Sequence, residues 1–261
     1  MSLVQSAIES GVATVTLCRS EKRNALSREL LTQLSAAVNE VLADSQTRVL
    51  VLKAEGKVFC AGMDLAEMQA RATSEDGQKE WMKDSQDYCE LLVALYTANV
   101  PTVAALQGPV LAGGVGMVLA CDFVVAVEEA FLSLPEPQRG ITAAMVTPLL
   151  VHRVGAGAAG HLLLSGRRQT AAAAATTGLV YEVVNSDSLD QSVKALTDSI
   201  MLGSPEALAI TRRHLDEVGG NDLVARIRQS IEVSAQARAS DDAREGLAAF
   251  LEKRKPNWQN D

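Results

Sequence analysis

Two short turns rich in small residues, each directly after an apolar run, constrain this chain most. The first, residues 59–65 (FCAGMDL), follows 48–53 (RVLVLK), and the second, residues 108–114 (GPVLAGG), follows 103–106 (VAAL). Glycine has no Cβ, so backbone N–H groups at such turns can point into a cavity with no side chain over them. Two such N–H groups can bind an oxygen that carries developing negative charge. The pattern predicts an oxyanion site made of backbone atoms.

A single carboxylate, Glu136, follows the second turn at a distance that leaves room for one more strand. It stands between Pro135 and Pro137, whose fixed backbone angles predict a rigidly held side chain rather than a surface acid on a loose loop. Beside an apolar pocket, burial would raise the pKa of this carboxyl toward neutrality. A carboxylate next to oxyanion donors favours proton transfer beside a carbonyl group.

Strands and helices are expected to alternate along the first half of the chain. Ser27 precedes apolar residues at helical spacing and is expected to cap that helix, and a longer helix is expected from about Glu75 to Tyr96. This alternation predicts an α/β layered core. The expected strands are 11–17, 49–52, 103–106 and 123–127.

Alanine and leucine dominate beyond residue 145, where one strand is expected at 179–184 and helices from Ser204 onward. These helices have apolar faces but little mass of their own, so they should pack on the core or on a neighbouring subunit. Residues 155–160 (GAGAAG) match a dinucleotide-binding fingerprint literally. Because residues 148–154 before them look helical rather than strand-like, we interpret the glycines as one helix end and the next helix start.

Charge and composition exclude several classes of function. The chain has 261 residues and a formal net charge of −8, which gives no basic surface for nucleic acid. Its four cysteines are scattered, with neither metal-ligand spacing nor a disulfide pattern, so reduced thiols in the cytoplasm and no metal are expected. Neither an export signal nor a run long enough to span a membrane is present, which predicts no membrane partner.

Several segments together resemble the crotonase superfamily, the enoyl-CoA hydratase and isomerase enzymes, nearly end to end. The resemblance implies a spiral of ββα units with the acyl-CoA site in residues 1–200 and a helical oligomerisation region in 201–261. It also implies a homotrimer or a dimer of trimers, and an acyl-CoA thioester substrate that brings coenzyme A with it, so that no separate cofactor is needed. The segments are 22–26 (KRNAL), 59–65, 113–122, Pro135-Glu136, 178–180 (GLV) and 245–256 (EGLAAFLEKRKP).

The resemblance also implies roles for individual residues. The backbone N–H groups of Met63 and Gly113 would form the oxyanion hole, with Glu136 as the catalytic carboxylate. Lys253 lies in a basic tail that the resemblance places near the CoA phosphates, in some arrangements across a subunit boundary. The remaining implied substrate-binding residues are Ala25, Ala61, Asp64 and Gly116.

One departure bears on the reaction. The commonest family hydratases use two glutamates, but the position that matches the first of them is Gly116, which leaves Glu136 alone. Residues 113–117 and 140–148 look most like the branch that includes methylglutaconyl-CoA-type hydratases, so hydration of an α,β-unsaturated, branched or carboxylate-bearing acyl-CoA is expected.

Two alternatives stay open at this point. One carboxylate is enough to move a proton between C2 and C4, so a Δ3-Δ2-enoyl-CoA isomerase with Glu136 as sole base is the first alternative. A catalytically silent acyl-CoA-binding homologue is the second. An RNA-binding relative is disfavoured by the acidic charge of the chain.

Overall fold

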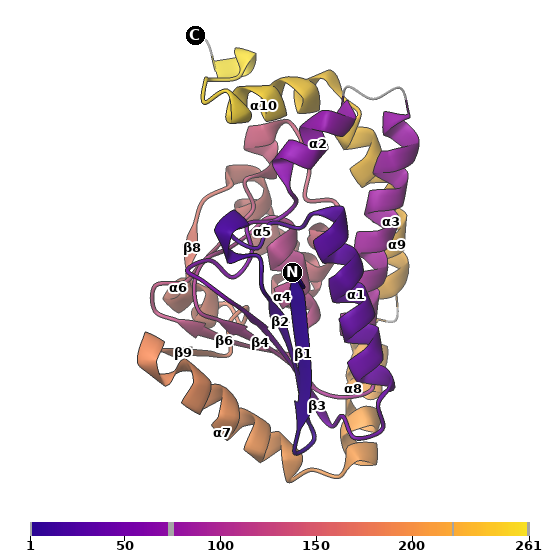
Figure 1. The fold of residues 1–261 in the computed structure, drawn as a ribbon, viewed down its shortest axis with the longest axis vertical. Coiled ribbons are helices and arrows are strands. Elements are labelled where there is room, and N and C mark those ends of the chain that lie inside the picture. The colour runs from indigo at the N-terminus through magenta and orange to yellow at the C-terminus, as the bar shows by residue number, and fades with distance from the viewer. Residues whose placement is uncertain (1, 73–75, 221, 260–261) are drawn as a thin grey trace.

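Two β-sheets form the centre of the fold, which the computed structural model describes over residues 2–72, 76–220 and 222–259 (Figure 1). The larger sheet has the order β1-β2-β3-β4-β6-β9, and the smaller has the order β5-β7-β8. In the larger sheet β1 pairs antiparallel with β2, and the pairs that follow are parallel. The strands are β1 Val4–Glu9, β2 Val12–Leu17, β3 Val49–Ala54, β4 Thr102–Leu106, β5 Val110–Leu111, β6 Phe123–Val127, β7 Phe131–Ser133, β8 Gln169–Thr170 and β9 Glu182–Val184.

Helices cover these sheets and extend beyond them. Helices α1, α3 and α9 form one flank, while α2 and α10 lie together at the end of the molecule that carries the C-terminus (Figure 1). The helices are α1 Arg28–Ala43, α2 Leu65–Ala72, α3 Gly77–Tyr96, α4 Gly113–Ala120, α5 Val146–Ser165, α6 Ala171–Thr176, α7 Leu189–Met201, α8 Pro205–Gly220, α9 Leu223–Arg238 and α10 Asp241–Leu251, with short 3-10 helices η1 Ser20–Lys22, η2 Glu136–Arg139, η3 Ser186–Ser188 and η4 Asn257–Gln259.

Local sequence explains most of these elements. Residues 49–52 in β3 are Val and Leu and are all buried, as in a parallel strand covered on both faces. The Ser27 hydroxyl accepts a hydrogen bond from the Leu30 N–H at 3.1 Å, which confirms the predicted cap of α1. Gly155 has φ +74° and interrupts the helical backbone of α5, which supports the interpretation of a helix end there. The predicted α/β class is therefore confirmed.

Other elements differ from the sequence-based expectation. Helix α2 was not expected, and it begins where the Asp64 carboxylate accepts the N–H groups of Ala66 and Glu67. Glu75, the expected start of the next helix, lies outside the described residues, and α3 begins at Gly77. The strand expected at 179–184 is reduced to β9, because the Leu179 N–H hydrogen-bonds the end of α6 instead of a strand. Strand β1 was missed, since its burial lacks a clear alternation.

The C-terminal helices pack on the core of the same chain. Helix α9 lies along α3, and α10 lies against η2 and α2. A Cβ at Gly246 in α10 would overlap the Arg139 carbonyl of η2, so only glycine permits this close approach. Residues 223–251 therefore help to form the surroundings of Glu136. Among the described helices, none has the length and apolar character needed to cross a bilayer.

Candidate active site

A cavity of about 650 Å³ opens between the two small-residue turns, η2 and the helices α2, α9 and α10. It gathers residues that are far apart in the sequence. Both proposed oxyanion donors and the proposed catalytic carboxylate line it, together with three of the proposed substrate-binding residues. These are Met63, Gly113, Glu136, Ala25, Ala61 and Asp64.

The two turns touch at one edge of the cavity. Gly62 has φ +84°, and a Cβ at this position would lie 2.5 Å from the Ala112 Cβ and 3.3 Å from the Gly113 nitrogen. Only a residue without a side chain allows the turns to come this close. Ala112 itself has φ +52°, a conformation that alanine rarely adopts. This backbone conformation precedes Gly113 and sets the direction of its N–H group.

The N–H groups of Met63 and Gly113 have no acceptor within the part of the chain that the structure describes. Met63 is held on both sides, since the Leu26 N–H donates to the Gly62 carbonyl at 2.8 Å and the Asp64 N–H donates to the Leu26 carbonyl at 3.1 Å. Gly113 is the first residue of α4, so the helix dipole adds positive potential at its N–H. The pair can therefore stabilise an oxygen anion.

Tyr88 of α3 supports the second turn, and the sequence analysis did not find it. Its buried hydroxyl donates a hydrogen bond to the Gly113 carbonyl. A Cβ at Gly116 would overlap this same hydroxyl, so Tyr88 occupies the space that glycine leaves in α4. Burial raises the pKa of Tyr88, which keeps the phenol protonated as a donor.

Glu136 begins η2 and is 6% exposed, and the Oε2 atom of its carboxyl has no hydrogen-bond partner among the described residues. Burial raises its pKa to about 7, against the opposing effects of its own backbone N–H and of the positive charge on Arg238. A carboxyl with such a pKa can both accept and return a proton near neutral pH.

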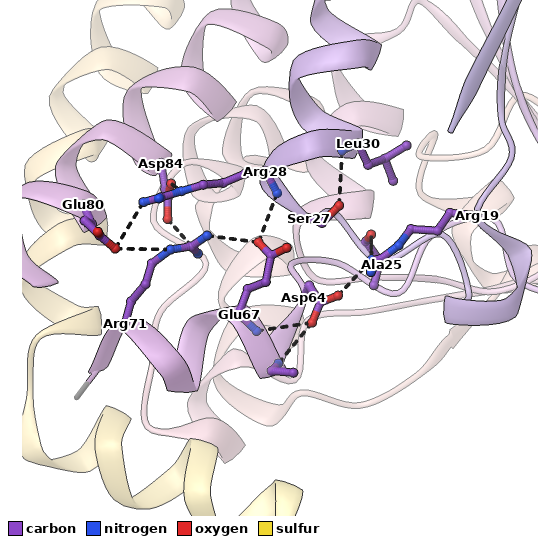
Figure 2. Close-up of polar contacts among 11 residues, drawn as sticks. Arg19, Ala25, Ser27, Arg28, Leu30, Asp64, Glu67, Arg71, Glu80 and Asp84 are labelled. Atoms are coloured by element: carbon purple, nitrogen blue, oxygen red, sulfur yellow. Dashed lines mark hydrogen bonds and ion pairs between the residues drawn. The ribbon is translucent and has the colours of Figure 1, made fainter. Parts of the chain in front are cut away.

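Ion pairs hold α2 against the rest of the site (Figure 2). Asp64 pairs with Arg19 at 2.8 Å; burial raises the pKa of this carboxyl, but the Arg19 hydrogen bond and the N–H groups of α2 outweigh burial and lower it overall. Asp84 of α3 accepts both Arg28 of α1, at 2.6 Å, and Arg71 of α2, at 2.9 Å. These pairs fix α2, which contributes Leu65 and Met68 to the cavity wall.

Two of the proposed substrate-binding residues do not line the cavity. Gly116 is buried inside α4 with the Tyr88 hydroxyl beside it. Lys253 is exposed beyond the end of α10, in a left-handed conformation with φ +56°. The basic residues that line the cavity come from other segments: Lys22, Arg23, Arg139, Arg168 and Arg238.

Arg238 and Ser234, both on α9, are cavity residues that the sequence analysis missed. Ile227, Ser234, Ala235 and Arg238 are buried on α9 at helical spacing, so Arg238 interrupts an otherwise apolar or small face. A charged residue on the buried face of an amphipathic helix is the sequence signal that could have identified it.

Comparison with known proteins identifies the family of this chain. Residues 7–261 match the model of the family described as enoyl-CoA hydratase/isomerase. A Thermus thermophilus protein provisionally named an enoyl-CoA hydratase is 38% identical over 96% of this chain and 99% of its own length. The 2,3-dehydroadipyl-CoA hydratase of Escherichia coli K12 is 33% identical over 95% of each chain.

A solved structure leads to the same conclusion. The crystal structure of an enoyl-CoA hydratase from Mycobacterium avium covers 99% of both chains with a TM-score of 0.85 and 32% identity. Sequence and fold are thus similar to those of known enoyl-CoA hydratases over almost the whole chain. The protein belongs to the enoyl-CoA hydratase/isomerase family and is a crotonase-fold enzyme of acyl-CoA metabolism.

Proposed function

We propose that this enzyme adds water across the C2=C3 double bond of an α,β-unsaturated acyl-CoA, with Glu136 as its sole catalytic carboxylate. One observation carries the proposal. A buried carboxyl, whose Oε2 atom has no hydrogen-bond partner among the described residues and whose pKa is raised to about 7 by burial, lines the same cavity as the N–H groups of Met63 and Gly113. The arrangement combines a proton-transfer group with an oxyanion site on one substrate-sized space.

In the proposed reaction the thioester oxygen accepts hydrogen bonds from the N–H groups of Met63 and Gly113. Ionised Glu136 removes a proton from water, and the water oxygen forms a bond to C3 while the C2=C3 π electrons move toward the carbonyl. The two N–H groups stabilise the resulting enolate. Protonated Glu136 then donates its proton to C2, which regenerates the carboxylate and leaves the 3-hydroxyacyl thioester.

Coenzyme A is proposed to enter past the rim formed by η1 and the first turn. Lys22 and Arg23 are the cations there, beside Ala25 and Ala61, whose small side chains leave the backbone accessible. This placement suits the phosphates of a bound thioester. Lys253 is proposed to contact the phosphates only from a neighbouring subunit, since its own chain's cavity lacks it.

Isomerisation is a second candidate that one observation favours. Position 116 is filled by the Tyr88 hydroxyl and carries no carboxylate, so a second acid at this point of α4 is missing. Glu136 alone could then move a proton from C2 to C4 while the oxyanion site holds a dienolate. The retained, correctly buried Glu136 argues against a catalytically silent acyl-CoA binder.

A panel of thioesters separates these reactions. We expect the native protein to lower the conjugated-thioester absorbance of crotonyl-, 3-methylcrotonyl- or 3-methylglutaconyl-CoA. This loss reports hydration, and comparison of the three substrates shows whether the enzyme accepts a branched acyl chain. Appearance of that absorbance from a 3-enoyl-CoA would instead identify an isomerase. Binding of every thioester with no turnover would contradict both proposals and favour the silent homologue.

We also propose that the subunits form a homotrimer or a dimer of trimers. Helix α8 exposes Leu215 and Val218 at 66% and 74%, and Ile210 at 48%, more apolar surface than an isolated helix face normally leaves in water. Leu215→Asp should lower the mass found by light scattering, whereas Glu206→Asp, on the same helix, should not. An unchanged mass in the Leu215 variant would exclude α8 from the interface.

A further inference from the structure

Helix α9 places one buried guanidinium at the cavity. Arg238 is 8% exposed and lines the cavity. Within the described ranges it makes no hydrogen bond or ion pair, and its guanidinium carbon lies 5.8 Å from the centroid of the Trp81 ring. A buried arginine normally has carboxylate or carbonyl partners for its five N–H donors.

Neither acid near Arg238 forms an ion pair with it among the described residues. Asp84, the strongest opposing charge near Arg238, is bound by Arg28 and Arg71 (Figure 2). Glu136 lies beyond ion-pair distance, and its raised pKa leaves it only partly ionised at neutral pH. The positive charge of Arg238 therefore remains available to a molecule in the cavity.

A second donor lies one helical turn away on the same face. Ser234 lines the cavity, and its hydroxyl oxygen accepts a hydrogen bond from the Ser85 hydroxyl at 3.2 Å. Accepting this bond leaves the Ser234 proton free to be donated. Two donors separated by one turn of α9 can bind the two oxygens of one carboxylate.

The other arginines of the cavity lack this combination. The guanidinium carbon of Arg139 lies 4.1 Å from the centroid of the Phe250 ring, and that of Arg168 lies 4.5 Å from the centroid of the Phe131 ring. Arg168 is exposed and Arg139 is partly exposed, whereas Arg238 is buried beside Trp81. An exposed rim cation suits a solvated phosphate, and a buried, unpaired one suits a carboxylate carried in on an acyl chain.

We infer that Arg238, with Ser234, binds a carboxylate at the far end of the acyl chain, so that the preferred substrate is an α,β-unsaturated dicarboxylic acyl-CoA. The double bond in this substrate class rests on the proposed function, whereas the carboxylate does not. The carboxylate would supply the acceptors that Arg238 lacks, and a neutral chain end would leave the guanidinium buried and unpaired. The contact between Arg238 and the terminal carboxylate therefore provides both affinity for dicarboxylic acyl chains and selectivity against neutral ones.

Binding of saturated thioesters tests the inference without any turnover. Calorimetry with the 261-residue protein compares adipyl-CoA with hexanoyl-CoA, which has the same chain length and a methyl end, and with the terminal amide of adipyl-CoA. We expect adipyl-CoA to bind about 10- to 100-fold more tightly than either neutral ligand, the range for a charge-assisted hydrogen bond pair. Equal affinity of the native protein for the three ligands would overturn the inference, whatever any variant does.

Two variants then locate the preference. Arg238→Met should reduce the adipyl-to-hexanoyl ratio to about 1, because it removes the charge and keeps an unbranched side chain. Arg228→Met is the matched control, since Arg228 lies on the same helix but is exposed and faces Glu90 at 3.8 Å; it should keep the native ratio. A full preference in Arg238→Met would assign the carboxylate to another cation and overturn the proposal.

Kinetics separates this inference from the proposed reaction. With 2,3-dehydroadipyl-CoA and 2-hexenoyl-CoA, the native enzyme should show the same preference in kcat/KM, and Arg238→Met should lose it. If neither thioester is hydrated but adipyl-CoA binds selectively through Arg238, the hydratase proposal fails and the carboxylate site stands. If both unsaturated thioesters are hydrated equally well, and adipyl-CoA and hexanoyl-CoA bind equally well, the hydratase proposal stands and the carboxylate site fails.

Discussion

The two sides of the cavity are built in different ways. On one side, the turns at 62–63 and 112–113 present backbone N–H groups. Such groups occur in nearly every residue, and here a glycine allows the two turns to come close enough to present them together. On the other side, α3 and α9 present the side chains of Tyr88, Ser234 and Arg238. We expect the backbone side to bind the thioester oxygen of any substrate, and the helical side to select among acyl chains.

Glu136 stands between these two sides and depends on both. Its turn is held by α10, through the close approach of Gly246 to Arg139, and its pKa responds to burial and to Arg238. Changes to the backbone side should therefore alter turnover of every substrate, and changes to the helical side should alter the choice among substrates. The predictions below test this division.

The largest effect is expected for Glu136→Gln, which preserves size but removes the basic oxygen. Loss of a general base lowers kcat by about 100- to 10,000-fold, while the affinity for a saturated thioester should change little. Glu21→Gln is the control, because Glu21 also lines the cavity but is exposed at its rim. Near-native turnover by the Glu136 variant would show that another group transfers the proton.

The backbone side can be disturbed through Gly62. In Gly62→Ala the new Cβ meets Ala112 at 2.5 Å, so the turns must separate and the two N–H groups must move. A displaced oxyanion donor costs about 100-fold or more in kcat. Gly178→Ala is the matched control: it has a similar positive φ of +78° but no atom within 4 Å, so it should show only backbone strain. Equal losses in both variants would attribute the effect to strain alone.

The pH profile tests the state of Glu136. As the base, it must be ionised in the free enzyme, so kcat/KM should rise about tenfold per pH unit below 7 and level off above the pKa of about 7. The measurement is kcat/KM as a function of pH at constant ionic strength, with a thioester whose acyl chain has no ionisable group. A profile flat between pH 5 and 8 would contradict the assignment.

The raised pKa of Glu136 should also make the folded protein less stable as pH rises, over the range in which activity increases. Because the folded-state pKa exceeds the ordinary value of 4.5, ionisation of Glu136 destabilises the fold as pH rises from about 4.5 to about 7. Glu136→Gln should therefore be more stable than the native protein at pH 8, and the difference should shrink toward pH 5. Denaturant unfolding at the two pH values measures it, and a pH-independent difference would contradict the burial effect.

The smallest effect is expected at Gly116, on the border between the two sides. Gly116→Ala pushes the Tyr88 hydroxyl away from the Gly113 carbonyl, which should cost about 1–3 kcal/mol of stability and a few-fold in kcat. Gly157→Ala, a helical glycine with no atom within 4 Å, should be neutral or stabilising. A thermal melt that ranks the two variants the other way would show that Tyr88 does not support the oxyanion turn.

Gly116→Glu should fail to supply a second catalytic carboxylate, since Tyr88 fills that space.

The outcome of the sequence analysis follows the same division between the two sides. Glycines, prolines and short apolar runs are local signals, so the turns, the Ser27 cap and the α/β core were predictable. Helix α2 and strand β1 were missed because a carboxylate cap and an edge pairing, rather than apolar periodicity, specify them. Gly116 and Lys253 were assigned to substrate through the family pattern, but the structure places neither on the cavity wall.

The sequence by itself determined several strands and both small-residue turns, the small residues that permit the oxyanion geometry, and Glu136 as the candidate catalytic carboxylate. These follow from backbone freedom and hydrophobic patterning, which act over a few residues. Only the tertiary structure decided that α9 faces α3, where Ser85 and Ser234, 149 positions apart, meet. Whether Arg238 has a partner depends on where each neighbouring acid lies and on what that acid binds, and that is a property of three-dimensional packing that no local pattern contains.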